Sequence, residues 1–476
     1  MGLVVSCLAL PCLALPCRAL PYLALARTTT FNSPPLTSPS SLSRYRGWTT
    51  LLQLARASPW LPCPLTIRDR PAFRERGLML DVSRDRVPTM DDLFLLVRKM
   101  ARLKLNHLQL YIEHTFEYRD HGGVHRESSP LTRDEIRTLR KFCDARFVVL
   151  VPNQNVSSGR GGILVLSRIK SSLRSLQTLG HMHRWLKHER YRALSECPAG
   201  VPHFFSGGEG MAGAEPFSLC AVDPDAFALV SELVGEMGDA FWGDGGGSGS
   251  AGGGGGAATA AATTTATAVT TTAQSQRPLY FHVGLDEAFD LCRERGKGTS
   301  KVAAWTSWLT RLRTRLREVR EGRGKDATLL IWGDFLKSNA EAIAKLPTDG
   351  SVVVCEWGYE ASDDFAPALS KLRAAGVPAF VCPGTSGWNS IAGRWTNAEA
   401  NLRRAAVQGV EHGAIGYLIT DWGGETGIYA PRLSISISIS LSISISISIS
   451  LSLSLPPSRS RSPPLVSSHK DCAKGN

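Results

Sequence analysis

Two carboxylates stand side by side at the end of an apolar run, in the segment PLYFHVGLDEAFDL (278–291). They are Asp286 and Glu287, and they follow His282 in the pattern H-x-G-x-D-E. On a regular strand neighbouring side chains point to opposite faces, so both acids reach one ligand only where the chain turns out of a sheet. Adjacent acids at such a turn can divide proton transfer and charge stabilisation between them. We therefore expect a strand that ends at this pair.

Aromatic residues stand at the ends of four of the other apolar runs. One tryptophan taken alone favours a core role, but four at equivalent places, with acids beside them, favour a binding site. Indole faces stack on the apolar faces of a sugar ring, while polar groups bind its hydroxyls. The four are Trp332, Trp357, Trp388 and Trp422. The polar residues at or beside the ends of the runs include Arg76, Asp81, Arg84, Glu113, His114, Asn155 and Asp421.

The apolar runs alternate with amphipathic helical patterns from residue 76 onward. Each run is apolar on both faces, as the strands of a buried parallel sheet are. Eight such units predict an α/β fold, a (β/α)₈ TIM barrel, in which the active site lies where the strands end. The predicted strands are 76–82, 105–112, 146–152, 279–285, 327–333, 351–357, 378–384 and 414–420. The predicted helices are 88–104, 131–144, 223–241, 301–320, 337–346, 365–375 and 397–408, and Thr89 with Asp92 and Thr132 with Glu135 form capping boxes at the first two.

Several stretches do not fit the barrel pattern, which covers 71–430. Residues 1–70 are rich in Pro, Ser and Leu, and we expect them to be disordered or to resemble a targeting segment. Insertions at 156–179 and 244–273 interrupt the barrel, and the second consists mainly of Gly, Ala and Thr. Residues 431–476 hold an Ile/Ser repeat and a basic tail where a normal last helix is expected. The strict alternation of the repeat predicts a strand with one Ile/Leu face and one Ser face.

The bulk composition excludes few classes of function. The net charge is +12, but the arginines of 301–325 fall on the wet face of a helix without a base-stacking platform, so we expect no nucleic-acid partner. The eleven cysteines include no CxxC pair, and we expect neither a metal nor another cofactor. Pro11, Pro16 and Pro21 break the apolar N-terminus, so no membrane span is expected. That terminus favours the secretory pathway slightly, and a cytoplasmic location stays open.

The motifs together resemble a known family. The run RGLMLDVSRDRVPTM…LKLNHLQLYIEHTFEY…VPNQN…GHMHRWLKH…FHVGLDEAFDL is similar to the catalytic barrel of glycoside hydrolase family 20, the β-N-acetylhexosaminidases, and within it to the branch resembling hexosaminidase D. The resemblance covers roughly residues 74–430 without the insertions. H-x-G-x-D-E at the end of the fourth strand is its most specific part.

The resemblance implies a mechanism and a site. Glu287 is implied as the acid/base, and Asp286 as the residue that orients the substrate's 2-acetamido group, whose carbonyl oxygen is the nucleophile. The implied activity is that of a retaining exo-β-N-acetylhexosaminidase acting on glycans or glycoconjugates that contain N-acetylhexosamine. Arg76 is matched to an arginine that binds sugar hydroxyls. The expected substrate-binding residues are Arg76, Glu113, His114, Asn155, His282, Trp332, Trp357, Trp388, Asp421 and Trp422.

Two departures from the family pattern leave alternatives open. Glu113 and His114 stand where an Asp-rich strand end is usual, and TDWGG, with Asp421, replaces the usual Trp-x-Glu. With the insertions and the missing helix, these departures permit an inactive sugar-binding barrel, or a misassembled one from a faulty gene model. A metal-dependent hydrolase using His114, His282 and Asp286 is a third hypothesis, although these residues lack a ligand-type spacing.

Overall fold

The computed structural model divides the chain into two compact units, Met1–Arg70 with Ser450–Asn476, and Pro71–Ile449. Each unit is described by itself. The structure describes residues 3–6, 30–31, 41–57, 66–84, 86–154, 179, 182–201, 215–243, 279–320, 327–389, 394–423 and 451–454. Most of the two insertions, Asn155 and residues 424–450 lie outside these residues.

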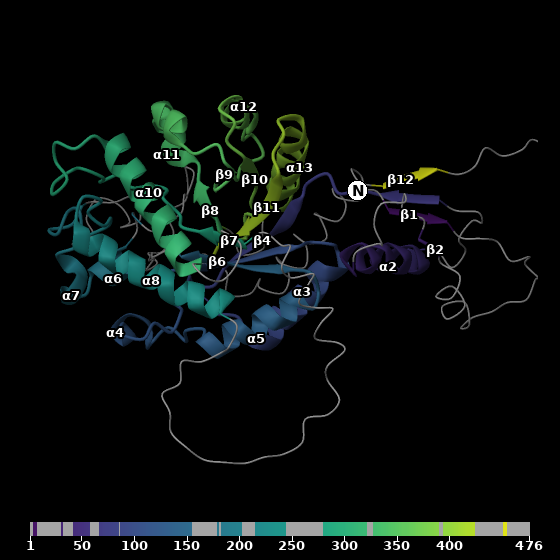
Figure 1. Cartoon of the computed structure of the whole chain (residues 1–476), viewed down its shortest axis with the longest axis horizontal. Coiled ribbons are helices and arrows are strands. Elements are labelled where there is room, and N and C mark those ends of the chain that lie inside the picture. The colour runs from purple at the N-terminus through teal and green to yellow at the C-terminus, as the bar shows by residue number, and fades with distance from the viewer. Residues whose placement is uncertain are drawn as a thin grey trace, which may run out of the picture. The chain divides into compact units, whose positions relative to one another are not determined.

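The larger unit contains a closed barrel of eight parallel strands (Figure 1). Around the barrel the strands follow the order β10-β11-β4-β5-β6-β7-β8-β9, so β4 closes the ring against β11. This confirms the predicted TIM barrel. The strands are β4 (Glu75–Asp81), β5 (His107–Ile112), β6 (Val149–Gln154), β7 (Leu279–His282), β8 (Ala327–Trp332), β9 (Val352–Trp357), β10 (Ala379–Cys382) and β11 (Gly416–Asp421).

Helices cover the outside of the barrel, and α8 and α10 lie side by side (Figure 1). Thr89 accepts a hydrogen bond from the Asp92 amide, and Thr132 with Glu135 forms a complete capping box. The longer helices are α3 (Met90–Arg102), α5 (Arg133–Asp144), α8 (Pro224–Trp242), α10 (Lys301–Arg320), α12 (Ala366–Ala374) and α13 (Trp395–Glu411). Shorter ones are α4 (Gly122–His125), α6 (His183–Leu186), α7 (Glu189–Arg192), α11 (Asp334–Ser338) and the 3₁₀ turns η2 (Ala340–Lys345) and η3 (Gly387–Asn389).

One predicted helix differs from the structure. The pattern at 337–346 predicts a single helix, whereas the chain forms the short α11 and then the 3₁₀ turn η2. Asn339 separates them, with φ −135° and ψ 67°, and its side chain donates a hydrogen bond to the Phe335 carbonyl at 2.9 Å. This local bond competes with the helical pattern, as asparagine side chains often do.

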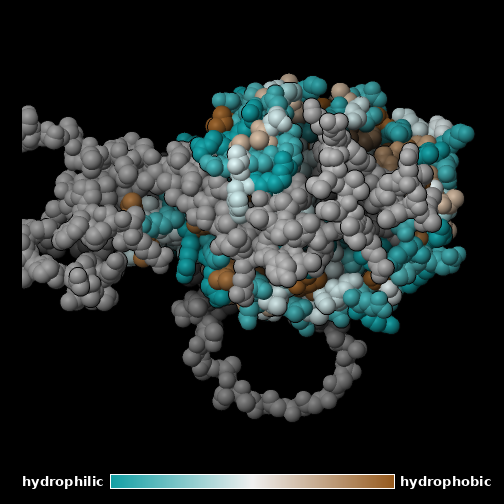
Figure 2. Space-filling view, turned by 180° about the vertical axis from the view of Figure 1, so that it is seen from behind, coloured by the Kyte–Doolittle hydropathy of each residue, from teal (hydrophilic) through white to brown (hydrophobic). Residues whose placement is uncertain are grey.

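The core of the barrel unit has two layers. Along β4, Leu78 and Leu80 pack against the surrounding helices, while Met79 between them joins the cluster inside the barrel. This alternation places successive side chains on opposite faces of the sheet. At the ends of the strands the inner layer becomes aromatic, with Trp332, Trp357 and Trp422 as members. The described surface in Figure 2 is mostly hydrophilic, with scattered hydrophobic residues of the kind normal for a folded protein.

The smaller unit has secondary structure that our prediction for residues 1–70 lacked. A sheet of four short strands has the order β12-β3-β1-β2, and α2 (Ser41–Ala57) buries Leu51. Thr50 on this helix donates a hydrogen bond to Asp69 at 2.9 Å. The strands are β1 (Leu3–Ser6), β2 (Thr30–Phe31), β3 (Thr66–Asp69) and β12 (Leu451–Ser454), the last from the end of the Ile/Ser repeat. No helix among the described residues is long and apolar enough to cross a membrane.

Candidate active site

The chain turns out of the barrel directly after β7. Backbone pairing with β8 continues past the strand, since the Val283 amide donates to Leu330 at 3.0 Å and the Trp332 amide donates to Gly284 at 2.9 Å. Leu285 (φ 72°) and Glu287 (φ 44°) then adopt left-handed backbone conformations, which non-glycine residues rarely do. At this turn Asp286 and Glu287 leave the alternation of the strand.

Asp286 is fully buried, and neither of its carboxylate oxygens accepts a hydrogen bond from another described residue. Burial raises the pKa of Asp286 well above its ordinary value, and the nearby acids Asp334 and Glu287 raise it further. Arg84 opposes this rise. A buried acid without a donor is costly to ionise, and a ligand that brings an N–H group or a positive charge would stabilise its charged form.

Glu287 is partly buried, and its backbone is held by the first residue of α11, which follows β8. The amide of Glu287 donates a hydrogen bond to Oδ2 of Asp334 at 2.8 Å. Asp334 begins α11, directly after β8. Burial raises the pKa of Asp334 to about 6, although the hydrogen bond from Glu287 lowers it. Asp334 is an acid at a strand end, in the sequence WGD, to which the sequence pattern gave no role.

Arg84 is one of the arginines that the fold brings to this end of the barrel. It lies after β4, with Nε 3.2 Å from Oε1 of Glu113 and Nη1 3.3 Å from Oδ2 of Asp81. Nη2 donates to the hydroxyl of Tyr111 at 3.1 Å, and that hydroxyl donates to Glu113 at 2.9 Å. Burial by itself would lower the pKa of Arg84, but Tyr111, Glu113 and Asp81 raise it overall. Glu113 is thus the buried acidic partner of a permanent cation.

Arg76 lies at the opposite end of the same strand, so the prediction that it binds sugar is wrong on geometry. It precedes Asp81 by five residues, about 17 Å at the rise of a parallel strand. Its guanidinium donates to the carbonyls of Phe73 (2.7 Å), Arg74 (3.0 Å) and Lys104 (2.7 Å). Arg76 therefore braces loops at the start of the barrel strands. Arg84, which the sequence places eight residues later, occupies the site instead.

The rings of His282, Trp332 and Trp422 lie next to one another and form one side of a group of aromatic residues, which we call the aromatic wall. The ring centroids of His282 and Trp332 are 4.4 Å apart, and those of Trp332 and Trp422 are 5.9 Å apart. The Arg84 guanidinium lies 5.2 Å from the centroid of Trp422. Nδ1 of His282 lies 3.0 Å from the Gly284 amide, which donates to it. Burial lowers the pKa of His282 well below its ordinary value, so the ring is neutral.

A second aromatic group continues the wall and includes a residue that the sequence analysis did not single out. Trp357 stacks on Tyr359 at 5.1 Å between centroids and an interplanar angle of 19°. Trp388 meets Tyr359 edge to face at 5.2 Å, and Tyr359 lies 6.4 Å from Trp422. Tyr359 follows Trp357 in the motif EWGYE, so its place after a strand was the available signal.

The remaining predicted residues, Asp421, His114 and Asn155, differ in their surroundings. Asp421 is buried and already bonded, since Thr385 donates to Oδ1 at 2.6 Å and Arg86 donates to Oδ2 at 3.2 Å. His114 is buried, and desolvation, with Arg184 and Lys187 nearby, lowers its pKa to about 4. Asn155 lies outside the described residues. Its described neighbour Asn153 pairs in register with His282.

One group among the described residues has the spacing of a metal site. Ligand atoms of His121, Glu232 and Glu236 lie within 4.8 Å of one another. Oε2 of Glu236 accepts a hydrogen bond from the Arg119 amide at 3.1 Å and pairs with Arg133, so a guanidinium already supplies positive charge there. None of the three residues of the metal-hydrolase hypothesis belongs to this group.

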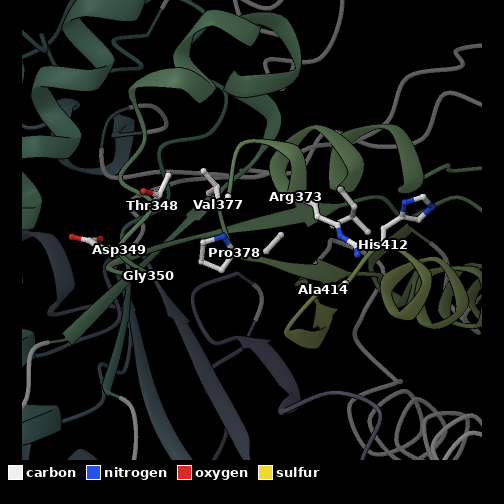
Figure 3. A pocket seen from close by; sticks show the side chains of 12 residues that line it. Thr348, Asp349, Gly350, Arg373, Val377, Pro378, His412 and Ala414 are labelled. Carbon is white, nitrogen blue, oxygen red and sulfur yellow. The ribbon is translucent and has the colours of Figure 1, made fainter.

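A hollow of about 440 Å³ lies at the opposite end of the barrel. It is lined by residues that precede β9, β10 and β11, and Figure 3 shows Thr348 and Asp349 on one side of it and Arg373 and His412 on the other. No residue of the aromatic wall and neither acid of the β7 turn lines it. Because barrel enzymes carry their chemistry at the other face, we assign the candidate active site to the β7 turn.

Comparison with solved structures yields many similar folds. A Flavobacterium johnsoniae chitobiase aligns with a TM-score of 0.54 and 17% identity, over 92% of this chain and 56% of its own. A family 20 β-N-acetylhexosaminidase from Streptomyces coelicolor aligns with a TM-score of 0.52 and 16% identity, over 84% and 72%. A variant Streptomyces plicatus β-hexosaminidase in complex with its product GlcNAc aligns with a TM-score of 0.53 and 16% identity, over 84% and 71%.

These similarities are similarities of fold, at identities of 14–17%. This chain spans only a little over half the length of the Flavobacterium chitobiase. No protein-family model and no curated protein matches the chain.

Proposed function

We propose that the chain is a glycoside hydrolase of family 20, a retaining exo-β-N-acetylhexosaminidase that removes terminal N-acetylhexosamine from glycans or glycoconjugates. The observation that carries the proposal is the β7 turn, where the buried carboxylate of Asp286, which no other described residue hydrogen-bonds, stands beside Glu287. The aromatic wall, the Arg84 cluster and the folds of the three hexosaminidases above support it.

Asp286 suits the acetamido group of such a substrate. Its unoccupied oxygens would accept the amide N–H, which orients the acetamido carbonyl oxygen toward the anomeric carbon. As that oxygen attacks, positive charge develops on the acetamido group, and an ionised Asp286 would stabilise it in a water-poor site. Burial and two neighbouring acids make the ionised form of Asp286 costly. A positive charge on the intermediate would offset that cost, whereas a neutral substrate would not, so Asp286 would favour the intermediate over the ground state.

Glu287 would move the proton. It gives its proton to the glycosidic oxygen while the C1–O bond breaks and the acetamido oxygen bonds to C1. A water molecule then attacks C1 and loses a proton to Glu287. At the same time the bond between C1 and the acetamido oxygen breaks, which restores the acetamido group. The two inversions at C1 leave the anomeric configuration unchanged.

The rest of the site would bind the sugar ring. Trp357 and Trp422, which keep a slight exposure at the ends of the strands, would stack on the sugar, and the fully buried Trp332 packs against Trp422. Three of the five N–H donors of Arg84 face Glu113, Asp81 and Tyr111, which leaves donors for sugar hydroxyls.

The test is hydrolysis of a chromogenic β-N-acetylglucosaminide by the purified chain, with Glu287→Gln and Asp286→Asn alongside. We expect activity in the wild type and little in either variant, and a proton NMR time course should show the β-anomer of the sugar first. Activity unaffected by Glu287→Gln would remove the assignment. Binding of the sugar without hydrolysis by the wild type would favour the inactive sugar-binding alternative.

A further inference from the structure

The short helix α11 stands between the candidate active site and the next strand. It begins at Asp334, and the Gly333 amide just before it donates to the Cys355 carbonyl of β9 at 3.1 Å. A helix of this length has little stability of its own. Its position therefore depends on contacts with the barrel.

Lys337 supplies two such contacts. Its ammonium lies 2.6 Å from Oε1 of Glu356 and donates to the carbonyl of Trp357 at 3.1 Å. Glu356 is buried in β9, with a relative exposure of 2%. Burial raises the pKa of Glu356, and Lys337 opposes that rise. The ion pair thus ties α11 to the strand that carries part of the aromatic wall.

Asp334 extends this connection to the β7 turn. Its Oδ2 accepts the hydrogen bond from the Glu287 amide at 2.8 Å, which links two residues 47 positions apart. Glu287 needs such a partner because its φ of 44° is unfavourable for a residue with a side chain. Asp334 also lies beside the Trp357 side chain, which lowers the pKa of Asp334, so its carboxylate faces both the β7 turn and the aromatic wall.

We propose that Asp334 is a positioning residue that holds the backbone of Glu287 in its left-handed turn, and that the Lys337–Glu356 ion pair fixes Asp334 in place. The inference rests on the proposed function, since it assigns Glu287 the proton transfer. It adds a residue that would act through Glu287 rather than on the substrate.

The charge of Asp334 has a second effect, which the experiment must separate from the hydrogen bond. The groups that act on the ionisation of Asp286 are Asp334 on α11, Glu287 on its own turn and Arg84 after β4. Asp334 raises the pKa of Asp286, so removal of its charge lowers that pKa. If Asp286 must be ionised for activity, the acid side of the pH profile then moves to lower pH.

Two variants separate the effects. Asp334→Asn keeps an acceptor oxygen of similar shape and removes the charge, whereas Asp334→Ala removes both. Asp349→Ala is the matched control, because Asp349 also accepts a backbone amide hydrogen bond, from Ser351 at 2.9 Å, but lies at the opposite end of the barrel. Thermal unfolding and circular dichroism establish that each variant is folded.

For Asp334→Ala we expect kcat at the pH optimum to fall about 100-fold with KM little changed, since a small displacement of a reacting group has an effect of that order. Asp334→Asn should retain kcat within about tenfold, and both should show the acid limb at lower pH. Asp349→Ala should match the wild type.

The inference is overturned if folded Asp334→Ala keeps the wild-type kcat while Glu287→Gln is inactive. It is also overturned if folded Asp334→Asn loses as much kcat as Asp334→Ala, because the charge rather than the hydrogen bond would then matter. A wild type without hydrolysis overturns the proposed function itself, and this inference with it.

Discussion

Two acids at opposite ends of the barrel, Asp286 and Asp349, show opposite effects of burial and hydrogen bonding. At the carboxyl ends of the strands, Asp286 is buried without a donor from any other residue in the described part of the chain, and burial raises its pKa. At the other end, Asp349 is largely exposed, and hydrogen bonds from the Ser351 side chain and amide lower its pKa. An acid bonded by its own loop stabilises the fold, whereas a buried acid without a partner destabilises it. Asp349 therefore stabilises the fold at the end without the candidate site, whereas Asp286 lowers the stability at the end where a ligand would bind.

The largest effect should come from the proton donor. We expect Glu287→Gln to lower kcat about a thousandfold, within the usual contribution of general acid–base catalysis. A variant at the other end, Asp349→Gln, should keep the wild-type kcat. Initial rates on a chromogenic β-N-acetylglucosaminide measure both. Equal activity of the two variants would remove the distinction between the ends.

Arg76, at the start of β4, and Arg84, just after its end, extend the comparison between the two ends of the barrel. Arg84→Met should lower the free energy of unfolding by about 3 kcal/mol, because it leaves Glu113 and Asp81 buried without their cation. It should also lower kcat/KM. Arg76→Met should lower the free energy of unfolding by about 1–3 kcal/mol through lost hydrogen bonds and leave kcat/KM unchanged. Urea unfolding and steady-state kinetics distinguish the two, and a loss of kcat/KM in Arg76→Met would return Arg76 to the site.

A smaller effect is expected at the aromatic wall. Trp422→Phe reduces the stacking face beside Arg84, and we expect kcat/KM to fall about tenfold. Its control is Trp308→Phe, which alters a fully buried tryptophan that packs against Phe227 outside the barrel. That change should lower the melting temperature without changing kcat/KM. If both variants lowered kcat/KM equally, the wall would have no special part in binding.

The smallest effects concern stability and pH, and they have opposite signs at the two ends. The pKa of Asp286 is raised by folding, so the unfolded chain loses this proton first: the fold loses stability as the pH rises from the ordinary value of about 4, and the loss is complete above the folded pKa. Asp286→Asn should therefore melt about 2–4 °C above the wild type at pH 8 and equal it near pH 4.

The pKa of Asp349 is lowered by folding, so its stabilisation is present above the ordinary value and is lost as the pH falls through the folded pKa. Asp349→Asn should melt slightly below the wild type at pH 8 and approach it in acid. Thermal melts of the two variants at both pH values measure this reversal, and a shift of the same sign in both would contradict it.

Several parts of the fold could be predicted because their causes are local. The caps at Thr89 and Thr132 depend on residues three positions apart, and the barrel depends on a repeat of apolar runs and amphipathic helices. The helix predicted at 337–346 is interrupted in the structure. The apolar pattern could not show that the Asn339 side chain would donate a hydrogen bond to the Phe335 carbonyl. The pair at Asp286 and Glu287 was also locally visible, as two acids where an apolar run ends.

The sequence by itself therefore determined the elements, their order and the strand ends at which chemistry is expected. Only the tertiary structure decided which side chains meet there. It placed Arg84 rather than Arg76 beside Glu113, joined Asp334 to Glu287 across 47 residues, and joined Arg86 to Asp421 across 335. Such pairs depend on the register of neighbouring strands and on closure of β4 against β11. Local patterns of hydrophobicity set the face of each strand, but they contain no information about its register against the neighbouring strand.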